Sequence, residues 1–357
     1  MRYPYLVTSD QHCHAWSQFS HINEAGVNNR LQIILDELKR AHDVLAAAGG
    51  KHSFYGGDLF HVRGNVQPSV FNPTVNTIRE IHGSWIDLQS FALAGNHDLE
   101  GRNSNDLGNA MQQLGLIEGF NVVIGEVLAG DVLVISWVQE LDELRAVLAK
   151  WAKNERAAKL DVIIHAPVNE ILKGLPDHGL SPEELAAYGF RRVFAGHYHD
   201  HKVMLGGKVI SIGATTHQTW SDPNTNAGFL LVYEDRVEFH KSQAPSFVDI
   251  EGADYESMED LVAHVAGNYV RVKLENVTEA EIKEWRDGLE ESGAVGVNIV
   301  ATKKRPEAER GVVTKGASKT LEASVAEFVT KSVEGPEAAE VQKLCADFIA
   351  KARMAEA

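Results

Sequence analysis

An apolar run leads directly into a glycine and three polar residues in the stretch Phe91-Ala92-Leu93-Ala94-Gly95-Asn96-His97-Asp98. The apolar run predicts a buried strand, and the glycine predicts a sharp turn where that strand ends. In α/β proteins the carboxyl ends of the strands are where ligand sites assemble. The stretch therefore predicts an α/β fold with a polar site at a strand end.

Four further clusters of polar residues follow predicted strands in the same way. They are Asp10 and His12 after Tyr5-Leu6-Val7, Gly57 and Asp58 after Ser53-Phe54-Tyr55, His165 after Val162-Ile163-Ile164, and Gly196, His197 and His199 after Val193-Phe194-Ala195. Side chains two apart on an extended backbone point the same way, so the Asp-x-His and His-x-His pairs are each expected to direct two ligands toward one place. Aspartate, asparagine and histidine at converging strand ends predict a metal site.

The order of the five clusters resembles the calcineurin-like metallophosphoesterase superfamily, whose pattern of Asp-x-His, Gly-Asp, Gly-Asn-His-Asp/Glu, His and Gly-His-x-His is complete here. The resemblance implies a paired-sheet sandwich flanked by helices, which holds two divalent metal ions. One ion would be held by Asp10, His12, Asp58 and His199, and the other by Asp58, Asn96, His165 and His197, with the Asp58 carboxylate bridging. Manganese is the favoured metal, with zinc, iron and magnesium as alternatives, because mixed nitrogen and oxygen ligands suit such ions.

The catalytic roles also follow from the resemblance. Two cations in such a site activate water and stabilise the attacking and leaving oxygens of a displacement at phosphorus. His97 resembles the family's catalytic histidine that is not a ligand, and it would stabilise the transition state or protonate the leaving oxygen. Asp98 is expected to orient His97.

The second cluster indicates which phosphoester is cut. The sequence Gly57-Asp58-Leu59-Phe60-His61 resembles the SbcD family of DNA exonucleases and its archaeal and eukaryotic double-strand-break repair counterparts. In that family the histidine three residues after the bridging aspartate takes part in the nuclease reaction, and His61 matches it. Protein Ser/Thr phosphatases instead have Gly-Asp-x-Val-Asp-Arg-Gly, whereas here Arg63-Gly64 falls one residue too late and the second aspartate is missing.

The predicted function is therefore a metal-dependent DNA nuclease subunit that acts in DNA repair, recombination or replication. Exonuclease activity is expected, endonuclease activity stays open, and the partners would be DNA and an SbcC-like coiled-coil ATPase. A homodimer is left open. The alternative is a stand-alone phosphodiesterase or phosphatase for small molecules or cyclic nucleotides on the same two-metal site. A scaffold whose metals only hold the fold is a third interpretation, which the complete set including His97 disfavours.

Three domains are expected, covering residues 1–245, 246–305 and 306–357. The first would be catalytic. In the second, residues 245–260 predict a linker plus a helix, and a strand, helix, strand module follows, with Thr278 and Glu281 forming a capping box. By its topology this module resembles the DNA-contacting cap of the SbcD family. The last domain has apolar residues at helical spacing on both sides of Gly335-Pro336, which predicts two amphipathic helices that dock on the ATPase or pack on the chain's own body.

The composition bounds these predictions. The chain of 357 residues has 34 basic and 50 acidic side chains, a net charge of −16, which opposes binding of DNA by an all-over basic surface. DNA contact would depend on the metals, on local clusters such as Lys303-Lys304-Arg305, and on a basic partner. Only two cysteines occur, Cys13 and Cys345, and Cys13 is expected to be a buried thiol. No secretory signal and no apolar stretch of about 18 residues is found, which predicts a cytoplasmic protein without a membrane span.

Overall fold

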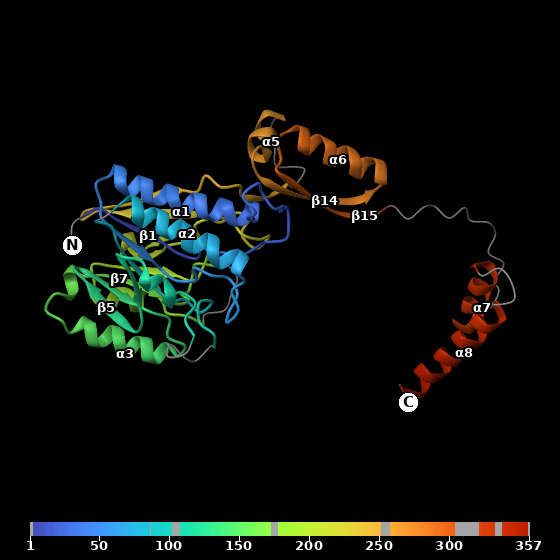
Figure 1. The fold of residues 1–357 in the computed structure, drawn as a ribbon, viewed down its shortest axis with the longest axis horizontal. Coiled ribbons are helices and arrows are strands. Elements are labelled where there is room, and N and C mark those ends of the chain that lie inside the picture. The colour runs from blue at the N-terminus through green and yellow to red at the C-terminus, as the bar shows by residue number, and fades with distance from the viewer. Residues whose placement is uncertain are drawn as a thin grey trace. The chain divides into compact units, whose positions relative to one another are not determined.

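The computed structural model describes residues 3–85, 87–101, 108–172, 178–250, 258–303, 321–332 and 338–355. The chain divides into two compact units, residues 1–303 and 304–357 (Figure 1). The predicted catalytic region and the predicted cap as far as residue 303 fall in the first unit, and the predicted helical pair falls in the second. In the described part of the chain, no helix combines the length and the apolar character needed to cross a membrane.

Two six-stranded sheets form the body of the first unit. One has the order β12-β11-β1-β2-β3-β4, with bounds Val237–Lys241, Gly228–Val232, Tyr5–Thr8, His52–Tyr55, Gln89–Leu93 and Phe120–Val123. The other has the order β5-β6-β7-β8-β10-β9, with bounds Glu126–Ala129, Val132–Ile135, Asp161–His165, Arg192–Gly196, Val209–Ser211 and Lys202–Met204. The strands β1 to β4 are parallel, and so are β6, β7, β8 and β10. Each parallel group therefore ends on one edge of its sheet, where the predicted polar clusters begin.

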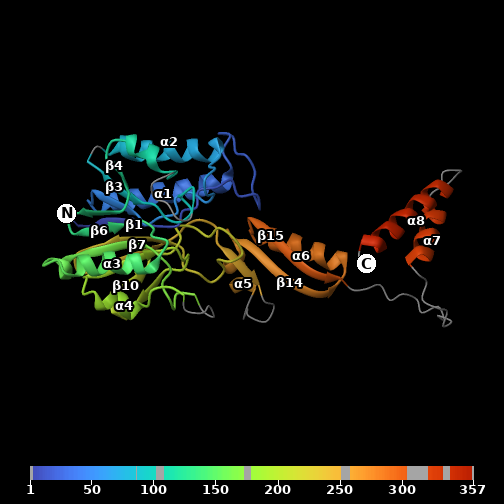
Figure 2. The ribbon, with the colours of Figure 1, turned by 90° about the horizontal axis from the view of Figure 1, so that it is seen from below.

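The core lies between the two sheets and continues beneath helices on their outer faces. Tyr5 and Phe54 from the first sheet pack in one buried cluster with Ile163 and Phe194 from the second. The first sheet is covered by α1 (Asn29–Ala47) and α2 (Pro68–Ser84), and the second by α3 (Leu141–Ala152) and α4 (Pro182–Ala187), as Figure 2 shows. Short 3₁₀ helices cover Gln112–Leu116, Ala157–Lys159 and Leu205–Gly207. The predicted paired-sheet sandwich flanked by helices is confirmed.

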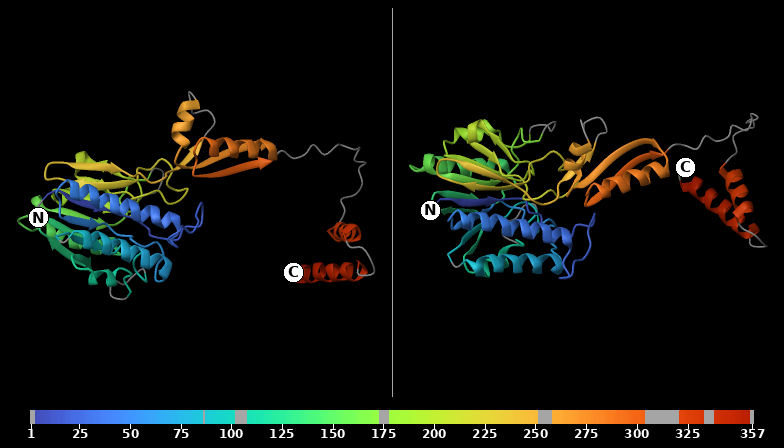
Figure 3. Two further views of the ribbon diagram at one scale, coloured as in Figure 1. Left: turned by 45° about the horizontal axis from the view of Figure 1, so that its top comes forward. Right: turned by 90° about the horizontal axis from the view of Figure 1, so that it is seen from above.

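A small three-stranded sheet follows the sandwich. Its parallel strands are β13 (Phe247–Ile250), β14 (Tyr269–Val277) and β15 (Gly296–Lys303), and its helices are α5 (Met258–Val265) and α6 (Glu279–Glu291) (Figure 3). The capping box of Thr278 and Glu281 is confirmed. The predicted linker was wrong at β13, because this strand of four residues is defined by its pairing with β14. The small sheet has its own apolar cluster. The domain boundary between residues 245 and 246 stays a prediction.

The second unit contains the two predicted helices, α7 (Leu321–Ser332) and α8 (Ala338–Ala355). Val329 is buried between them, and the Gln342 amide donates to the Ala326 carbonyl at 3.1 Å. Large apolar side chains on these helices remain exposed, namely Phe328 at 69%, Leu344 at 53% and Phe348 at 68%. The predicted break at Gly335-Pro336 and the residues Lys304-Arg305 of the predicted basic cluster lie outside the described residues.

A buried ion cluster holds the amino-terminal end of β7. The Asp161 carboxylate is fully buried and accepts hydrogen bonds from Arg191, Arg192 and the Tyr5 hydroxyl at 2.5 to 2.9 Å. Asp161→Ala is expected to lower the free energy of unfolding by about 3 to 5 kcal/mol, since it leaves the buried Arg192 and the half-buried Arg191 without their counter-charge. Urea unfolding measures this change. The control Asp142→Ala removes an exposed partner of Arg145 and should leave the midpoint unchanged; equal losses in both variants would contradict the argument.

Candidate metal centre

Asp58 lies at the middle of the predicted ligands. Its Oδ2 atom is 3.4 Å from His165 Nε2 and 3.6 Å from His12 Nε2. The Asn96 amide oxygen is 3.2 Å from His165 Nε2 and 3.1 Å from His197 Nδ1. These residues follow β1, β2, β3, β7 and β8, so both sheets contribute to one centre. Asp58 therefore stands between the two predicted ligand sets, as a bridging carboxylate must.

Among the described residues, three groups of possible ligand atoms share the site. The ligand atoms of Asp10, His12 and His199 all lie within 4.8 Å of one another, and so do those of Asp10, Asp58 and His165 and those of His12, His61 and His97. All seven residues predicted from the sequence as metal ligands are thus connected through these short distances.

The imidazole rings are oriented as ligands need to be. His165 Nδ1 donates to the Gly56 carbonyl at 2.8 Å, and His199 Nδ1 donates to the Asp222 carboxylate at 2.9 Å. In a neutral ring the proton on Nδ1 leaves the Nε2 lone pair free. A histidine that ligates a metal is commonly held in this way by a carboxylate or carbonyl on its other nitrogen. The sequence does not predict Asp222, because a separation of 23 positions from His199 gives no spacing signal.

The site has a buried carboxylate oxygen whose negative charge a cation would compensate. Asp10 Oδ1 is buried and has no hydrogen-bond partner in the described part of the chain. Glycine is required close by, because a Cβ atom at Gly95 would lie 2.2 Å from Asp58 Oδ1, and one at Gly57 would lie 2.4 Å from His165 Nδ1. A set of carboxylate, amide and imidazole donors matches manganese, iron or zinc. The residues present therefore fit two divalent cations.

The backbone reaches this arrangement through strained residues. Asp10, His12, Asp58 and His197 have φ angles of 51°, 46°, 54° and 111°, all in the region that favours glycine. The prediction that Asp10 and His12 extend their strand is wrong, because β1 ends at Thr8 and the chain then turns. Strain of this kind costs about 1 to 3 kcal/mol per residue and clusters at functional sites.

The electrostatics of the site favour bound positive charge. Burial lowers the pKa of His197 to about 3 and that of His12 well below its usual range. Both rings are therefore neutral, and each has a lone pair that can bind a metal ion. Burial also opposes charging of His165, but the Asp58 carboxylate outweighs it and raises the pKa of His165 to about 9. The carboxylates thus draw a proton onto one buried ring, and a divalent cation is a stronger partner for them.

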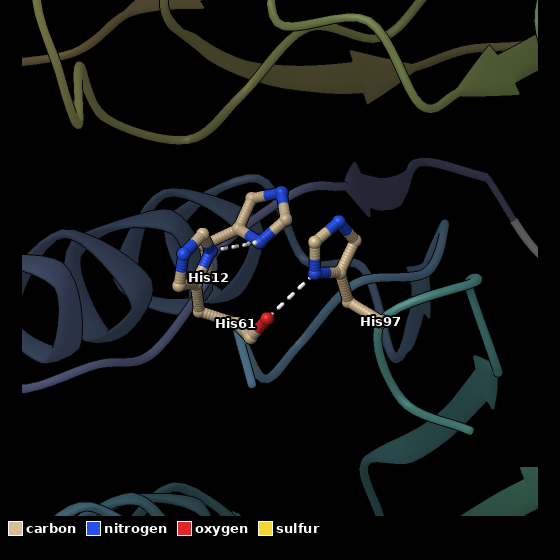
Figure 4. A group of neighbouring side chains, drawn as sticks. All are labelled: His12, His61 and His97. Carbon is tan, nitrogen blue, oxygen red and sulfur yellow. Dashed lines mark hydrogen bonds between the residues drawn. The ribbon is translucent and has the colours of Figure 1, made fainter. Parts of the chain in front are cut away.

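Two histidines stand beside the ligands without belonging to the predicted set (Figure 4). His61 Nδ1 is 3.2 Å from His12 Nδ1, so His61 contacts the His12 ring at the nitrogen that does not face Asp58. His97 Nδ1 donates to the His61 carbonyl at 2.6 Å, and the His97 backbone amide donates to Asp58 Oδ1 at 2.8 Å. The bond at Nδ1 therefore fixes the His97 ring, and the Nε2 atom is not used in that bond.

Asp98 acts on the loop and not on the His97 ring. Its buried carboxylate accepts hydrogen bonds from the backbone amides of Phe60 and Gly95, both at 2.9 Å. The expectation that Asp98 orients His97 directly is corrected, because the His61 carbonyl holds that ring. Asp98 instead connects the turn after β3 to the turn after β2 through hydrogen bonds. These turns carry His97 and His61, so Asp98 helps to position both residues.

Two aromatic side chains from the loop after β1 lie beside His61. The rings of His14 and Trp16 lie 5.0 and 4.6 Å from the ring of His61. Cys13, next to His12, is buried in the core beneath α1, as predicted for a thiol that is not a ligand. Burial raises its pKa to about 12, which keeps the thiol protonated.

No protein-family model and no curated protein sequence matches this chain. Among solved structures it is similar to a dimetal phosphatase from Danio rerio, at 13% identity over 65% of this chain and 92% of that chain, with a TM-score of 0.40. It is also similar to the nuclease MPE of Pseudomonas putida, at 16% identity over 65% of this chain and 86% of that chain, with a TM-score of 0.29. At these identities and scores neither activity carries over to this chain.

Asp58→Asn tests the central position of Asp58. The substitution removes the negative charge that both ligand sets share, so both ions are expected to be lost together, whereas His12→Ala should weaken mainly one. Metal analysis of the purified variants by mass spectrometry measures this. The control Asp200→Asn changes a carboxylate that accepts from the Asn226 amide at 2.8 Å and should keep wild-type metal content. Two tightly bound ions in Asp58→Asn would exclude a bridging role.

Proposed function

We propose that this chain is a metallophosphoesterase that hydrolyses the phosphodiester bonds of DNA. The observation that supports hydrolysis best is the gathering of the seven proposed ligand residues, Asp58 among them, in one centre, with His97 fixed beside them as a histidine outside the proposed ligand set. A fold that used metals only for stability would have no need of a ring held with one free nitrogen at its centre.

The ligand residues would hold two divalent cations, which when bound supply positive charge at the scissile phosphate and activate water. His97 acts through Nε2, because its Nδ1 proton is committed to the His61 carbonyl. In its protonated form Nε2 donates a proton to the departing oxygen, and the carbonyl stabilises the ring's positive charge. His61 holds His12 from one ring nitrogen and His97 from its backbone, so it positions both.

DNA as the substrate is supported by the Gly-Asp-Leu-Phe-His sequence and by the place of His61 next to a ligand. The net charge of −16 favours the alternative, a small-molecule or cyclic-nucleotide phosphodiesterase, because DNA is repelled by an acidic surface. The two functions differ in the size of substrate they accept. A small bis-ester reaches the centre in either case, whereas duplex DNA needs a contact surface.

Degradation assays distinguish these functions. With Mn²⁺ the purified chain is expected to cleave linear duplex, hairpin or single-stranded DNA as well as bis(p-nitrophenyl) phosphate, and a metal chelator should abolish all activities. Gel electrophoresis and absorbance measure the two reactions. Hydrolysis of the bis-ester and of cyclic nucleotides, with every DNA substrate left intact at low salt, would favour the alternative.

His97→Ala separates metal binding from chemistry. Its metal content should equal that of the wild type, while turnover of the bis-ester falls by about a hundredfold to ten-thousandfold, because a positioned acid acts on rate. Metal analysis and initial rates measure the two quantities. The matched control His201→Ala changes a ring that bonds the Ser211 carbonyl and stacks on Phe239, away from the ligands. Unchanged turnover in His97→Ala would exclude the proposed role.

The helices α7 and α8 support the further proposal of a partner ATPase. Their exposed Phe328 and Leu344 need an apolar surface, and a coiled coil supplies one. Changing both residues to aspartate is expected to abolish co-purification with a candidate SbcC-like ATPase while hydrolysis of the bis-ester is kept. The control Ser324→Asp adds one of these two negative charges at an exposed position of α7. Loss of bis-ester hydrolysis together with binding would place these faces in the chain's own core.

A further inference from the structure

Arg30 is a buried cation at the start of α1, enclosed by aromatic rings. Arg30 is only 5% exposed to solvent. The guanidinium carbon lies 5.6 Å from the ring centre of Trp16, 5.0 Å from that of Phe247 and 5.1 Å from that of Tyr269. Trp16 belongs to the loop after β1, whereas Phe247 and Tyr269 begin β13 and β14. Arg30 thus joins the small sheet to the edge of the metal centre.

Carbonyl groups and rings compensate the charge of Arg30. Its Nη2 donates to the Gln218 carbonyl at 2.7 Å and its Nη1 to the Gln18 carbonyl at 3.4 Å. Across the described residues, no carboxylate forms a salt bridge with it. A buried guanidinium is costly to desolvate, and cation–π contacts together with bonds to carbonyls offset that cost only in one geometry. The position of Arg30 is therefore tightly specified by its neighbours.

Gln218 connects Arg30 to two of the proposed ligands. Its side-chain amide donates to the Asp10 carbonyl at 2.7 Å. Its backbone amide donates to Asp222 Oδ2 at 2.8 Å, and the other oxygen of Asp222 accepts from His199 at 2.9 Å. A shift of the Gln218 carbonyl would consequently move both Asp10 and the partner of His199.

Trp16 provides a second route to the same ligand set. Its ring lies between Arg30 and His61, at 4.6 Å from the His61 ring, and His61 contacts His12. Both routes end on the Asp10, His12 and His199 group. Asn96, which belongs to the other proposed ion, bonds His197 and His165 through its side chain, and the His197 backbone amide donates to Asp10 Oδ2 at 3.0 Å. Arg30 is therefore linked to Asp10, His12 and His199 through fewer contacts than to Asn96 and His197.

We infer that Arg30 is a positioning residue that couples the small sheet of β13 to β15 to one of the two metal positions, the one formed by Asp10, His12 and His199. The inference rests on the proposed two-metal function. It adds that the small sheet has a role at the metal centre, because Phe247 and Tyr269 hold the Arg30 guanidinium that positions one ligand group. Displacing that sheet would change occupancy of one ion and leave the other.

Manganese titration of the metal-free protein tests this coupling, with Arg30→Met and Arg30→Lys as variants. Wild type is expected to bind two ions and to give the electron paramagnetic resonance spectrum of a spin-coupled pair. Arg30→Met should bind one ion about 10 to 100 times more weakly and give the spectrum of isolated Mn²⁺, as is usual when an outer partner of a ligand is lost. Arg30→Lys keeps the charge but loses the planar stacking, so its loss should be smaller.

Arg40→Met is the matched control, since Arg40 lies on the same helix, stacks on Phe229 at 4.7 Å and bonds Glu37. It should keep both ions and the coupled spectrum even where its thermal midpoint falls. Should Arg30→Met fail to fold, Gln218→Met carries the same expectation, because it keeps the backbone carbonyl that Arg30 bonds but removes the side-chain amide that donates to the Asp10 carbonyl. Two ions bound with wild-type affinity in Arg30→Lys and Gln218→Met, or equal weakening of both ions, would overturn the inference. A wild-type chain that binds fewer than two ions would instead overturn the proposed function.

Discussion

The position of the Asp58 carboxylate between His12 and His165 is the constraint on which the site depends. Distances of 3.6 and 3.4 Å to these rings bring strands of both sheets to one point. Two conditions make the position possible. Gly95 has no side chain to collide with Asp58, and the His97 amide donates to its other oxygen at 2.8 Å. The same contact sets the backbone of the proposed acid, so the ligand and the catalytic group are placed by one interaction.

The apolar patterns predicted the strands that lead to the site, because buried parallel strands need continuous apolar runs. The backbone conformation after each strand, and the residues that hydrogen-bond the ligands, could not be predicted in this way. The left-handed φ angles of Asp10 and His12 arise from the turn after β1, not from residue type. Asp222, Gln218 and Arg30 join the site through tertiary contacts across up to 208 positions, and no local spacing encodes these. Asp98 was assigned to the nearest histidine in sequence, whereas its partners are backbone amides.

The strain at the site and the stability of the fold are linked. Four residues with positive φ angles would relax if the surrounding loops were free to move. The loops are held by contacts that are themselves buried, namely Asp98 with the Phe60 and Gly95 amides, and Gln218 with the Asp10 carbonyl. The apolar core between the sheets thus stabilises a geometry that the loops would not adopt alone.

The two ends of β7 show how charge separates structure from function. At its start, Asp161 is fully buried and compensated by Arg191, Arg192 and a tyrosine hydroxyl. At its end, His165 faces Asp58, and among the described residues neither Asp58 nor Asp10 has a lysine or arginine partner. Two arginines balance the charge of Asp161, whereas Asp58 and Asp10 lie beside histidines. The negative charge of Asp58 and Asp10 can therefore be balanced by bound cations. This imbalance within a single pair of sheets is the physical reason to regard the carboxyl ends of the strands as the place where cations bind and chemistry occurs.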